Sequence, residues 1–326
     1  MNISSDIEKK EILCGTSTGK IYRVLTSDLS AHLHTDSHIA SLNDIAFPLN
    51  SNEIFGTIDD IGVIKVWDTS EYRVIFNAFS DTKEQGSSLC FDNETSLITG
   101  WKGGSIKCYD IKEKALLWSI AIAHRGSVNC IFSDANYMLT CGEDGPIRVW
   151  SKETHKLLLQ LSGHAKSAVK VFPDFKNPQL IHSCGIDKVV NTYDLKKEKK
   201  INGYAIKNGY FNDMCQRKDN ELELVTAGHG CPIQFWDVDY TEAVAKIETK
   251  ETISSIEISH NGHYLVVSTS ESDFMIFDIK DQSKITLVSR TESHSRKLNK
   301  VRWSPDDKQL VAIGKDGALC IFNSFL

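Results

Sequence analysis

One segment recurs eight times along this chain of 326 residues: an apolar run, a turn of small residues, and a second apolar run that ends in an aromatic residue. The copy at 53–68, EIFGTIDDIGVIKVWD, shows the pattern clearly. Alternating apolar residues on either side of a turn are typical of a β-hairpin. The terminal aromatics are spaced 41 to 45 residues apart, and they are Tyr22, Trp67, Tyr109, Trp150, Tyr193, Trp236, Phe277 and Phe322.

The segments between hairpins add further short strands, such as SVNCIFSD at 127–134 and LNKVRWSPDD at 298–307. Each repeat therefore supplies about four strands. A four-stranded antiparallel sheet cannot bury both of its faces alone, whereas sheets stacked radially cover one another and leave only short edges. No segment between the strands shows the 3.6-residue period of a helix. We therefore expect an all-β fold, a β-propeller with one sheet per repeat.

These repeats resemble the WD40 family of β-propellers, in which Gly-His precedes the first strand and Trp-Asp ends the third. Trp67-Asp68 and Trp236-Asp237 keep the dipeptide, and Gly163-His164 keeps the loop signature. The resemblance covers nearly the whole chain. It implies that a loop histidine, an aspartate of the hairpin turn and the tryptophan form a hydrogen-bonded relay that holds each blade.

By this resemblance the relay is most complete at His124, Asp144 and Trp150. Partial copies pair His164 with Asp187 and His294 with Asp316, and they end in Tyr193 and Phe322. The repeats of Tyr109 and Trp236 have Gly103 and Gly230 in place of the turn aspartate, which puts the relay in doubt there.

The two chain ends determine how such a ring closes. The last repeat stops after its third strand, and the segment 29–34 near the N-terminus reads as an outer strand that can complete that blade. We therefore predict a tail at 1–10, a leftover hairpin and linker at 11–28, and a single seven-bladed propeller at 29–326. We expect the hairpin at 11–25 to complete a sheet in another polypeptide or to lie against the seventh blade. The alternative is eight blades, with the terminal repeat shared between the two ends.

Several stretches also resemble, in order and spacing, the second propeller of the cilia- and flagella-associated protein 52 family. They include GTSTGKIYRVL at 15–25, ITGWKGGSIKCYD at 98–110 and GEDGPIRVW at 142–150. Members of that family carry two tandem propellers, and the first has no counterpart here. The resemblance implies a structural component of ciliary or flagellar axonemes, a microtubule inner protein on the doublet wall that contacts tubulin and other inner proteins. The location it implies is the cytoplasm, within the cytoskeleton of the cilium or flagellum.

Composition and motifs disfavour other classes of function. The net charge is −6 and the only Lys-rich run is 196–200, so we expect no nucleic-acid binding. No apolar run reaches the roughly 18 residues of a membrane span, and no signal peptide is visible. The nine cysteines form no CxxC pair. No nucleophile elbow or HExxH motif occurs, and acids such as Asp59, Asp60, Glu143 and Asp187 are typical turn formers. We expect no enzyme activity, cofactor or metal.

Protein recognition remains, because propellers present two broad loop faces on a rigid ring. The candidate contacts are aromatic and basic residues that ring packing does not require: Trp101, Lys102, Phe175, Lys196, Lys197, Lys199, Lys200, Tyr210 and Phe211. The sequence therefore predicts a non-catalytic interaction module. The alternative to an axonemal role is a soluble WD40 adaptor, such as a centriolar scaffold or a substrate receptor of a ubiquitin ligase.

Overall fold

The computed structural model describes residues 3–6, 11–15, 20–25, 27–28, 30–49, 51–80, 83–218, 223–237 and 243–324. These residues form β-strands almost throughout, with one short 3-10 helix, η1 (Gln282–Lys284). None of the described helical residues forms a segment long and apolar enough to cross a bilayer.

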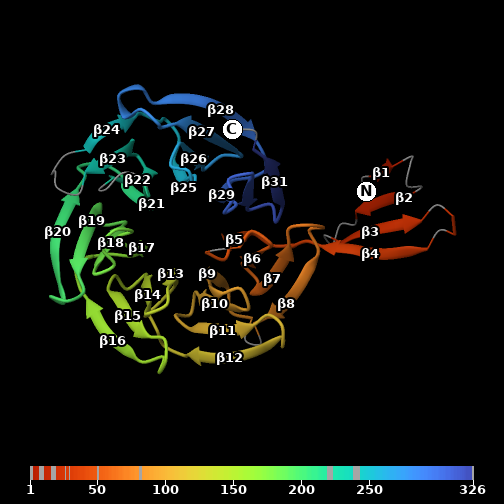
Figure 1. Cartoon of the computed structure of the whole chain (residues 1–326), viewed down its shortest axis with the longest axis horizontal. Coiled ribbons are helices and arrows are strands. Elements are labelled where there is room, and N and C mark those ends of the chain that lie inside the picture. The colour runs from red at the N-terminus through yellow and green to blue at the C-terminus, as the bar shows by residue number, and fades with distance from the viewer. Residues whose placement is uncertain are drawn as a thin grey trace.

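Seven antiparallel sheets, the blades, surround a common axis (Figure 1). Blades 1 and 2 comprise β5 (Leu42–Ala46), β6 (Ile54–Asp59), β7 (Val63–Asp68), β8 (Val74–Phe79), β9 (Gly86–Asn93), β10 (Ser96–Trp101), β11 (Ile106–Asp110) and β12 (Ala115–Ile120). Blades 3 and 4 comprise β13 (Val128–Ser133), β14 (Tyr137–Gly142), β15 (Ile147–Ser151), β16 (Leu157–Leu161), β17 (Ala168–Pro173), β18 (Leu180–Gly185), β19 (Val189–Asp194) and β20 (Lys199–Ala205).

The remaining blades follow the same order. Blades 5 and 6 comprise β21 (Tyr210–Gln216), β22 (Glu223–His229), β23 (Ile233–Asp237), β24 (Ala243–Ile247), β25 (Ile253–Ile258), β26 (Tyr264–Thr269), β27 (Asp273–Asp278) and β28 (Thr286–Glu292). In the part of the chain that the structure describes, blade 7 has three strands, β29 (Leu298–Trp303), β30 (Gln309–Gly314) and β31 (Leu319–Asn323). The predicted all-β propeller with seven blades is confirmed.

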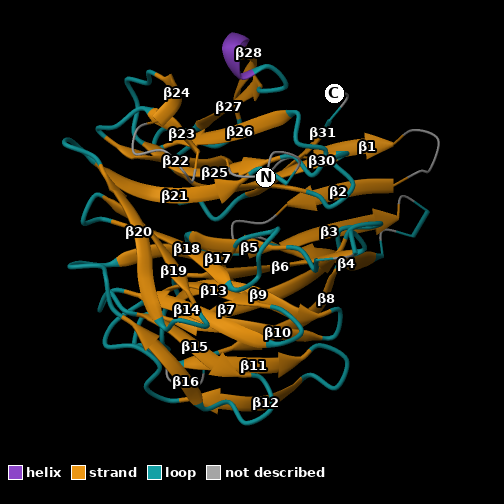
Figure 2. Cartoon of the chain, turned by 60° about the vertical axis from the view of Figure 1, so that its left-hand side comes forward, coloured by secondary structure: helices purple, strands orange, loops and turns teal. Residues whose placement is uncertain are grey.

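Blade stacking accounts for the burial along each strand. In β14 every residue after Tyr137 is buried, because both faces of the strand lie between neighbouring sheets (Figure 2). The fourth strands run along the rim and are much more exposed, as in β12. The described core consists of seven apolar clusters, each between two adjacent blades. Leu139 and Val149 of blade 3, for example, pack with Val171 and Ile181 of blade 4.

The N-terminal repeat differs from the prediction. Residues 11–25 supply β2 (Glu11–Gly15) and β3 (Lys20–Leu25), the two central strands of a separate sheet. β1 (Ile3–Asp6), from the predicted tail, and β4 (Ala31–Asp36) form its edges, and the sheet projects beside the ring in Figure 1. The hairpin is therefore completed by strands of its own chain. Residues 1–2, 7–10 and 29, which the predicted tail and closing strand also include, lie outside the described residues.

The prediction that the segment 29–34 closes the ring as an outer strand is wrong. β4 pairs with β3 from Lys20↔Asp36 to Val24↔Ala31, so it is an edge strand of the N-terminal sheet and not the outer strand of blade 7. Contacts between β29 and β5 join the ring instead: the Asn299 side chain donates to the carbonyl of Leu42 (2.7 Å) and to Ser41 Oγ (3.1 Å).

Apolar packing completes the closure. Leu42, Phe55 and Trp67 of blade 1 form one buried cluster with Val311 and Ile313 of blade 7. This interface is built like the other six. The ring therefore closes by side-chain packing and hydrogen bonds, with no strand shared between its ends among the described residues.

This closure predicts the effect of Asn299→Ala. The substitution removes two hydrogen-bond donations at the joint, so we expect the free energy of unfolding to fall by about 1–2 kcal/mol, measured by urea denaturation. Asn129→Ala is the matched control, because Asn129 makes the equivalent bonds to Ser167 Oγ and the Ala168 carbonyl (both 2.8 Å) inside the ring. A neutral N299A beside a destabilising N129A would contradict the closure described here.

Candidate functional site

The first strand of every blade faces the central channel and places one side chain against the next blade. These side chains occupy one equivalent position, and they are Asp44, Ser88, Cys130, Lys170, Asp213, Ser255 and Lys300. Ser88 Oγ donates to the Val128 carbonyl (2.7 Å), and the Cys130 thiol donates to the Val171 carbonyl (3.6 Å). The seven side chains at this position therefore form a ring of polar contacts around the channel, which we call the belt.

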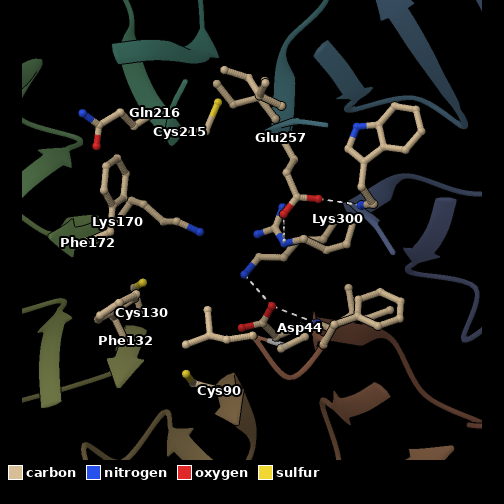
Figure 3. Close-up of a pocket in the computed structure, with 18 of the residues that line it drawn as sticks. Asp44, Cys90, Cys130, Phe132, Lys170, Phe172, Cys215, Gln216, Glu257 and Lys300 are labelled. Carbon is tan, nitrogen blue, oxygen red and sulfur yellow. Dashed lines mark hydrogen bonds and ion pairs between the residues drawn. The ribbon is translucent and has the colours of Figure 1, made fainter. Parts of the chain in front are cut away.

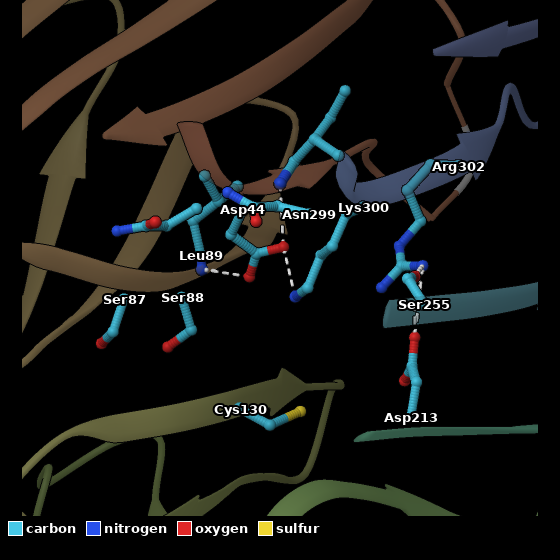
Figure 4. A network of polar contacts seen from close by, with 12 residues as sticks. Asp44, Ser87, Ser88, Leu89, Cys130, Asp213, Ser255, Asn299, Lys300 and Arg302 are labelled. Atoms are coloured by element: carbon cyan, nitrogen blue, oxygen red, sulfur yellow. Dashed lines mark hydrogen bonds and ion pairs between the residues drawn. The ribbon is translucent and has the colours of Figure 1, made fainter. Parts of the chain in front are cut away.

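Charged residues complete the belt (Figure 4). Asp44 accepts from the backbone N–H of Leu89 (3.0 Å) on one side and pairs with Lys300 (2.6 Å) on the other. Asp213 accepts from Ser255 Oγ (2.8 Å), and Arg302 donates to the same hydroxyl (3.0 Å). Together with the ion pair between Lys170 and Asp213 (3.6 Å), these contacts bridge all seven junctions between blades.

Asp213 is the most deeply placed charge of this belt. Its carboxylate is 3.6 Å from Lys170 Nζ and 3.8 Å from Arg302. Burial works to raise the pKa of Asp213, but the two cations and the hydrogen bond from Ser255 outweigh it and lower that pKa to about 2. The carboxylate is therefore ionised at neutral pH and balances two cations, the buried Arg302 and the partly buried Lys170.

A cavity of about 290 Å³ lies in the channel (Figure 3). Charged side chains, Lys170, Glu257 and Lys300 among them, line its interior. Burial raises the pKa of Glu257, whose carboxylate accepts a hydrogen bond from the backbone N–H of Trp303 (2.6 Å). Since cations and carboxylates pair with one another here, the lining suits structural pairing more than capture of a charged ligand.

The mouth of this cavity is apolar and partly exposed. Leu49 and Phe175 belong to its lining and are 65% and 48% exposed, respectively. Both lie in connections between first and second strands, which places them on the same face of the ring. Lys218, from another such connection, lies over the Phe175 ring at 5.4 Å from its centroid. Exposed aromatic and cationic groups of this kind are common at protein interfaces.

Cysteine thiols also line the channel, but their environments disfavour nucleophilic chemistry. Burial raises the pKa of Cys90 to about 12 and that of Cys215 well above its usual range. Cys130 lies opposite Cys141 on the adjacent strand, and interaction with that thiol and with the nearby Lys170 lowers the pKa of Cys130, against the effect of burial. Among the described residues no histidine contacts Cys130 and no group of three His, Cys, Asp or Glu residues is arranged to hold a metal.

The relay lies on the opposite face. His124 contacts Asp144 (2.7 Å) and Thr140 Oγ1 (2.8 Å), and the Trp150 indole donates to the same hydroxyl (2.8 Å). Burial lowers the pKa of His124, although the hydrogen bond to Asp144 opposes that shift. The histidine is therefore expected to be neutral at pH 7.

The partial copies lose different parts of this arrangement. His164 contacts Asp187 (2.9 Å) and Ser183 Oγ (2.6 Å), so a serine replaces the threonine. His294 contacts Asp316 (2.8 Å), but its buried Nε2 has no hydrogen-bond partner among the described residues. Ala312 occupies the strand position that Thr140 holds in blade 3, so the hydroxyl is missing.

One full relay escaped the sequence reasoning. In blade 1, His38 contacts Asp59 (2.7 Å) and Thr57 Oγ1 (2.8 Å), and Trp67 donates to that hydroxyl (2.9 Å). Asp59 also accepts from the N–H groups of residues 61 and 63, as a turn former does. The signal was present, because His38 precedes Asp59 by 21 residues, close to the 20 that separate His124 from Asp144.

The predicted contact residues divide into buried and exposed sets. Trp101 and Phe211 are fully buried, so their prediction as partner contacts is wrong. Trp101 donates to Thr99 Oγ1 (3.0 Å), and Phe211 packs between blades 4 and 5. Lys102 is exposed and pairs with Asp60 (2.8 Å), and Tyr210 is partly exposed and stacks on His229.

Exposed members lie on both faces of the ring. Lys102 and Tyr210 lie on the relay face, whereas Phe175, Lys196 and Lys197 lie on the face of the channel mouth. Lys199 and Lys200 begin the rim strand β20 and are exposed. The structure therefore does not gather the nine candidates into one site. Exposed Leu49 was absent from the prediction, because a lone aliphatic residue carries no sequence signal of exposure.

Comparison with known proteins agrees with this architecture. Residues 117–151 and 285–323 match the model of the WD domain, G-beta repeat. Cilia- and flagella-associated protein 52 from Sus scrofa is 26% identical over 325 residues, 98% of this chain and 51% of that protein. The Homo sapiens protein is 26% identical over 96% of this chain and 50% of that protein, and the Chlamydomonas reinhardtii protein 24% identical over 95% and 50%.

The chain thus spans about half the length of the curated relatives it matches. It carries WD40 repeats and forms a seven-bladed propeller similar to half of cilia- and flagella-associated protein 52.

The charge belt predicts the effect of Asp213→Asn. Removing this carboxylate leaves the buried Arg302 and the partly buried Lys170 without their common counterion, and the loss of one partner of a buried ion pair typically costs about 3–5 kcal/mol. Because the folded pKa of about 2 lies below the usual carboxyl value, the stabilisation is present at neutral pH and is lost as pH falls from about 4 to 2. We therefore expect the difference in stability between wild type and D213N to be largest near pH 7 and to shrink below pH 4.

Urea denaturation at pH 7 and at pH 3.5 measures this difference. Glu113→Gln, an exposed carboxyl in the turn before β12, is the matched control and should change stability little at either pH. A D213N penalty that stays constant between these two pH values would contradict the proposed charge balance.

The incomplete relay predicts a gain of stability. Ala312→Ser places a hydroxyl where Ser183 lies in blade 4, within reach of the unpartnered His294 Nε2. We expect about 1 kcal/mol of added stability in thermal and urea unfolding. Ala312→Cys is the control of similar size with a weak donor. If A312S is no more stable than A312C, the prediction is contradicted, because a partner for His294 Nε2 would then not raise the free energy of unfolding.

Proposed function

We propose that this chain is a non-catalytic interaction module of ciliary or flagellar axonemes. The observation that carries the proposal is its similarity, over 95% or more of its length, to proteins named cilia- and flagella-associated protein 52 from mammals and from a green alga. The similarity is spread along the ring rather than confined to one repeat, so it is consistent with a shared architecture and a shared location.

The geometry supports binding rather than catalysis. The acids and cations of the channel are paired with one another, and burial raises the thiol pKa values of Cys90 and Cys215, which line the channel. Seven blades joined by buried clusters give a ring that holds its loops in fixed positions. Fixed loops on two broad faces suit protein partners, because the loops lose little conformational entropy when a partner binds.

The finer proposal is a microtubule inner protein that contacts tubulin and neighbouring inner proteins on the doublet wall. It rests on the family resemblance, together with one surface feature. The face of the channel mouth presents exposed Leu49 and Phe175, and it also carries exposed Lys196 and Lys197 in the turn before β20. An apolar centre with cations toward the rim matches the usual arrangement of protein interfaces. We assign the contact surface to this face.

Localisation and stepwise extraction test the proposal. The tagged full chain is expressed in a ciliated cell, and isolated axonemes are treated with detergent, then high salt, then conditions that disrupt the microtubule wall. We expect the protein to stay with the doublets through high salt and to leave only in the last step. Complete release by detergent alone would contradict the proposal and favour a soluble adaptor.

A pair of variants tests the assigned face. Leu49→Ser with Phe175→Ala removes the exposed apolar groups at the mouth, and Ile122→Ser removes an 80% exposed residue on the relay face as the control. We expect the double variant to be released by high salt and I122S to behave as wild type. Equal retention of both would overturn the assignment of the face.

A further inference from the structure

Two neighbouring rim strands expose more apolar surface than the strands that follow them. β12 and β16 come one after the other along the rim in Figure 1. Near its start each strand has two exposed leucines, which we call the leucine patch: Leu116 (53% exposed), Leu117 (51%), Leu157 (45%) and Leu158 (63%). The next two rim strands, β20 and β24, expose one large aliphatic residue each, Ile201 and Val244.

A β-bulge accounts for the exposure of consecutive leucines. In β16, Leu157 pairs with Trp150 and Leu159 pairs with Val149, so Leu158 is the extra residue of a bulge. β12 carries the same bulge at the equivalent position. Because a bulge interrupts the alternation of side chains between the two faces of a sheet, two consecutive leucines reach solvent in each strand.

An aromatic contact joins the two pairs of leucines. Trp118, which follows Leu117, stacks on His155 with the ring centroids 4.2 Å apart. His155 lies in the turn that leads into β16, two residues before Leu157. The leucine patch therefore spans the junction between blades 2 and 3. Contiguous exposed apolar surface of this kind marks interaction sites.

Lysines gather on the edge of the rim next to the leucine patch. The segments 111–114, 152–156 and 195–200, which lead into or begin β12, β16 and β20, contain eight lysines and three glutamates in a chain of net charge −6. Lys152 pairs with Asp92, and Lys197 pairs with Asp194. The other six are exposed and have no acidic partner among the described residues: Lys112, Lys114, Lys156, Lys196, Lys199 and Lys200.

We propose that the leucine patch and these lysines form a second contact surface, apart from the channel mouth, that binds an acidic amphipathic helix of a partner protein. A helix presents apolar residues at positions i, i+3, i+4 and i+7 on one face, and such a row can cover the leucines of both strands. Carboxylates beside that face then meet the lysines, and this charge complementarity selects the partner.

Charge also disfavours two other occupants. A second copy of the chain bound through the same surface would bring lysines against lysines. An anionic bilayer would meet a glutamate in each of the three segments, at Glu113, Glu153 and Glu198. Lysines that alternate with glutamates match the mixed charges of a protein better than a uniformly negative surface.

A synthetic helical peptide, QELLEALEELLEALEQ, is the probe, with leucines along one face and glutamates along the other. The control peptide, QKLLKALKKLLKALKQ, keeps the apolar face and reverses the charge. In fluorescence anisotropy with the full chain, we expect the acidic peptide to bind about tenfold more tightly or better, although the chain as a whole is negative. Added salt should weaken this binding, because it screens exposed charges. Equal or tighter binding of the basic peptide would overturn the proposal.

Two matched double variants locate the site. Lys156→Glu with Leu158→Ser changes the patch, and Val244→Ser with Lys246→Glu makes the same two replacements on the rim of blade 5. All four side chains are exposed, so we expect both proteins to unfold at the temperature of the wild type. We expect the first variant to bind the acidic peptide about tenfold more weakly and the second to bind it as the wild type does. Equal affinities of the two variants would contradict the proposed location.

The other occupants have tests of their own. We expect the chain to stay in the supernatant when vesicles of phosphatidylserine and phosphatidylcholine are sedimented, and to be a monomer in analytical ultracentrifugation. Binding to vesicles that is lost in K156E/L158S would assign the patch to a bilayer and overturn the proposal. A dimer that is lost in the same variant would assign the patch to a second copy, with the same consequence.

Discussion

The structure depends on one constraint: a four-stranded blade has two apolar faces and cannot bury either of them by itself. Each blade is therefore stable only between two neighbours, and the first and last blades must find each other. The seven apolar clusters show how this is achieved, with residues such as Leu139 and Val171 contributed by adjacent sheets. The cluster that joins blade 7 to blade 1 is of the same kind, so packing joins the two ends of the ring and no described strand is shared between them.

The channel imposes a second requirement, because several polar side chains of the first strands, such as Asp44 and Asp213, are buried between adjacent blades there. Polar groups in such a position must find partners. The repeat places one polar or charged side chain per blade at the same position, and each reaches the adjacent blade. Asp213, between Lys170 and Arg302, shows the electrostatic form of this contact, and Asn299 at the closing joint shows the hydrogen-bonded form. Stability and shape of the ring therefore depend on the residues that line its channel, and the loops on its two faces are free to differ.

Sequence reasoning succeeded where a repeat carries the signal. The spacing of the terminal aromatics gave the propeller and its blades, because a periodic hairpin has few other ways to bury its faces. It placed the histidine and aspartate of the blade 3 relay in contact, yet it overlooked His38 and Asp59 at nearly the same spacing. Asp59 does form a turn, as the sequence predicts, and it also contacts the histidine of the relay.

Two kinds of feature could not be predicted from the sequence. Whether an aromatic residue in a turn is buried depends on the neighbouring blade, so Trp101 and Phe211 were taken for surface residues although the adjacent sheets cover them. The pairing of β4 depends on a choice between two edges, that of β3 and that of β31. A strand pattern alone does not distinguish between them, because both edges offer the same backbone groups. β4 pairs with β3, because these two strands are close in the sequence.

The claim on which the account depends is that blades 7 and 1 form a closed interface as stable as the others. Native-state hydrogen exchange of the isolated chain tests it by comparing amides of β5 and β29, at the joint, with those of β13 and β17, inside the ring. The account predicts that both pairs exchange only through global unfolding, with equal free energies of opening. A markedly lower free energy of opening for β5 and β29 would contradict it, because the ring would then open at its joint while the remaining blades stay folded.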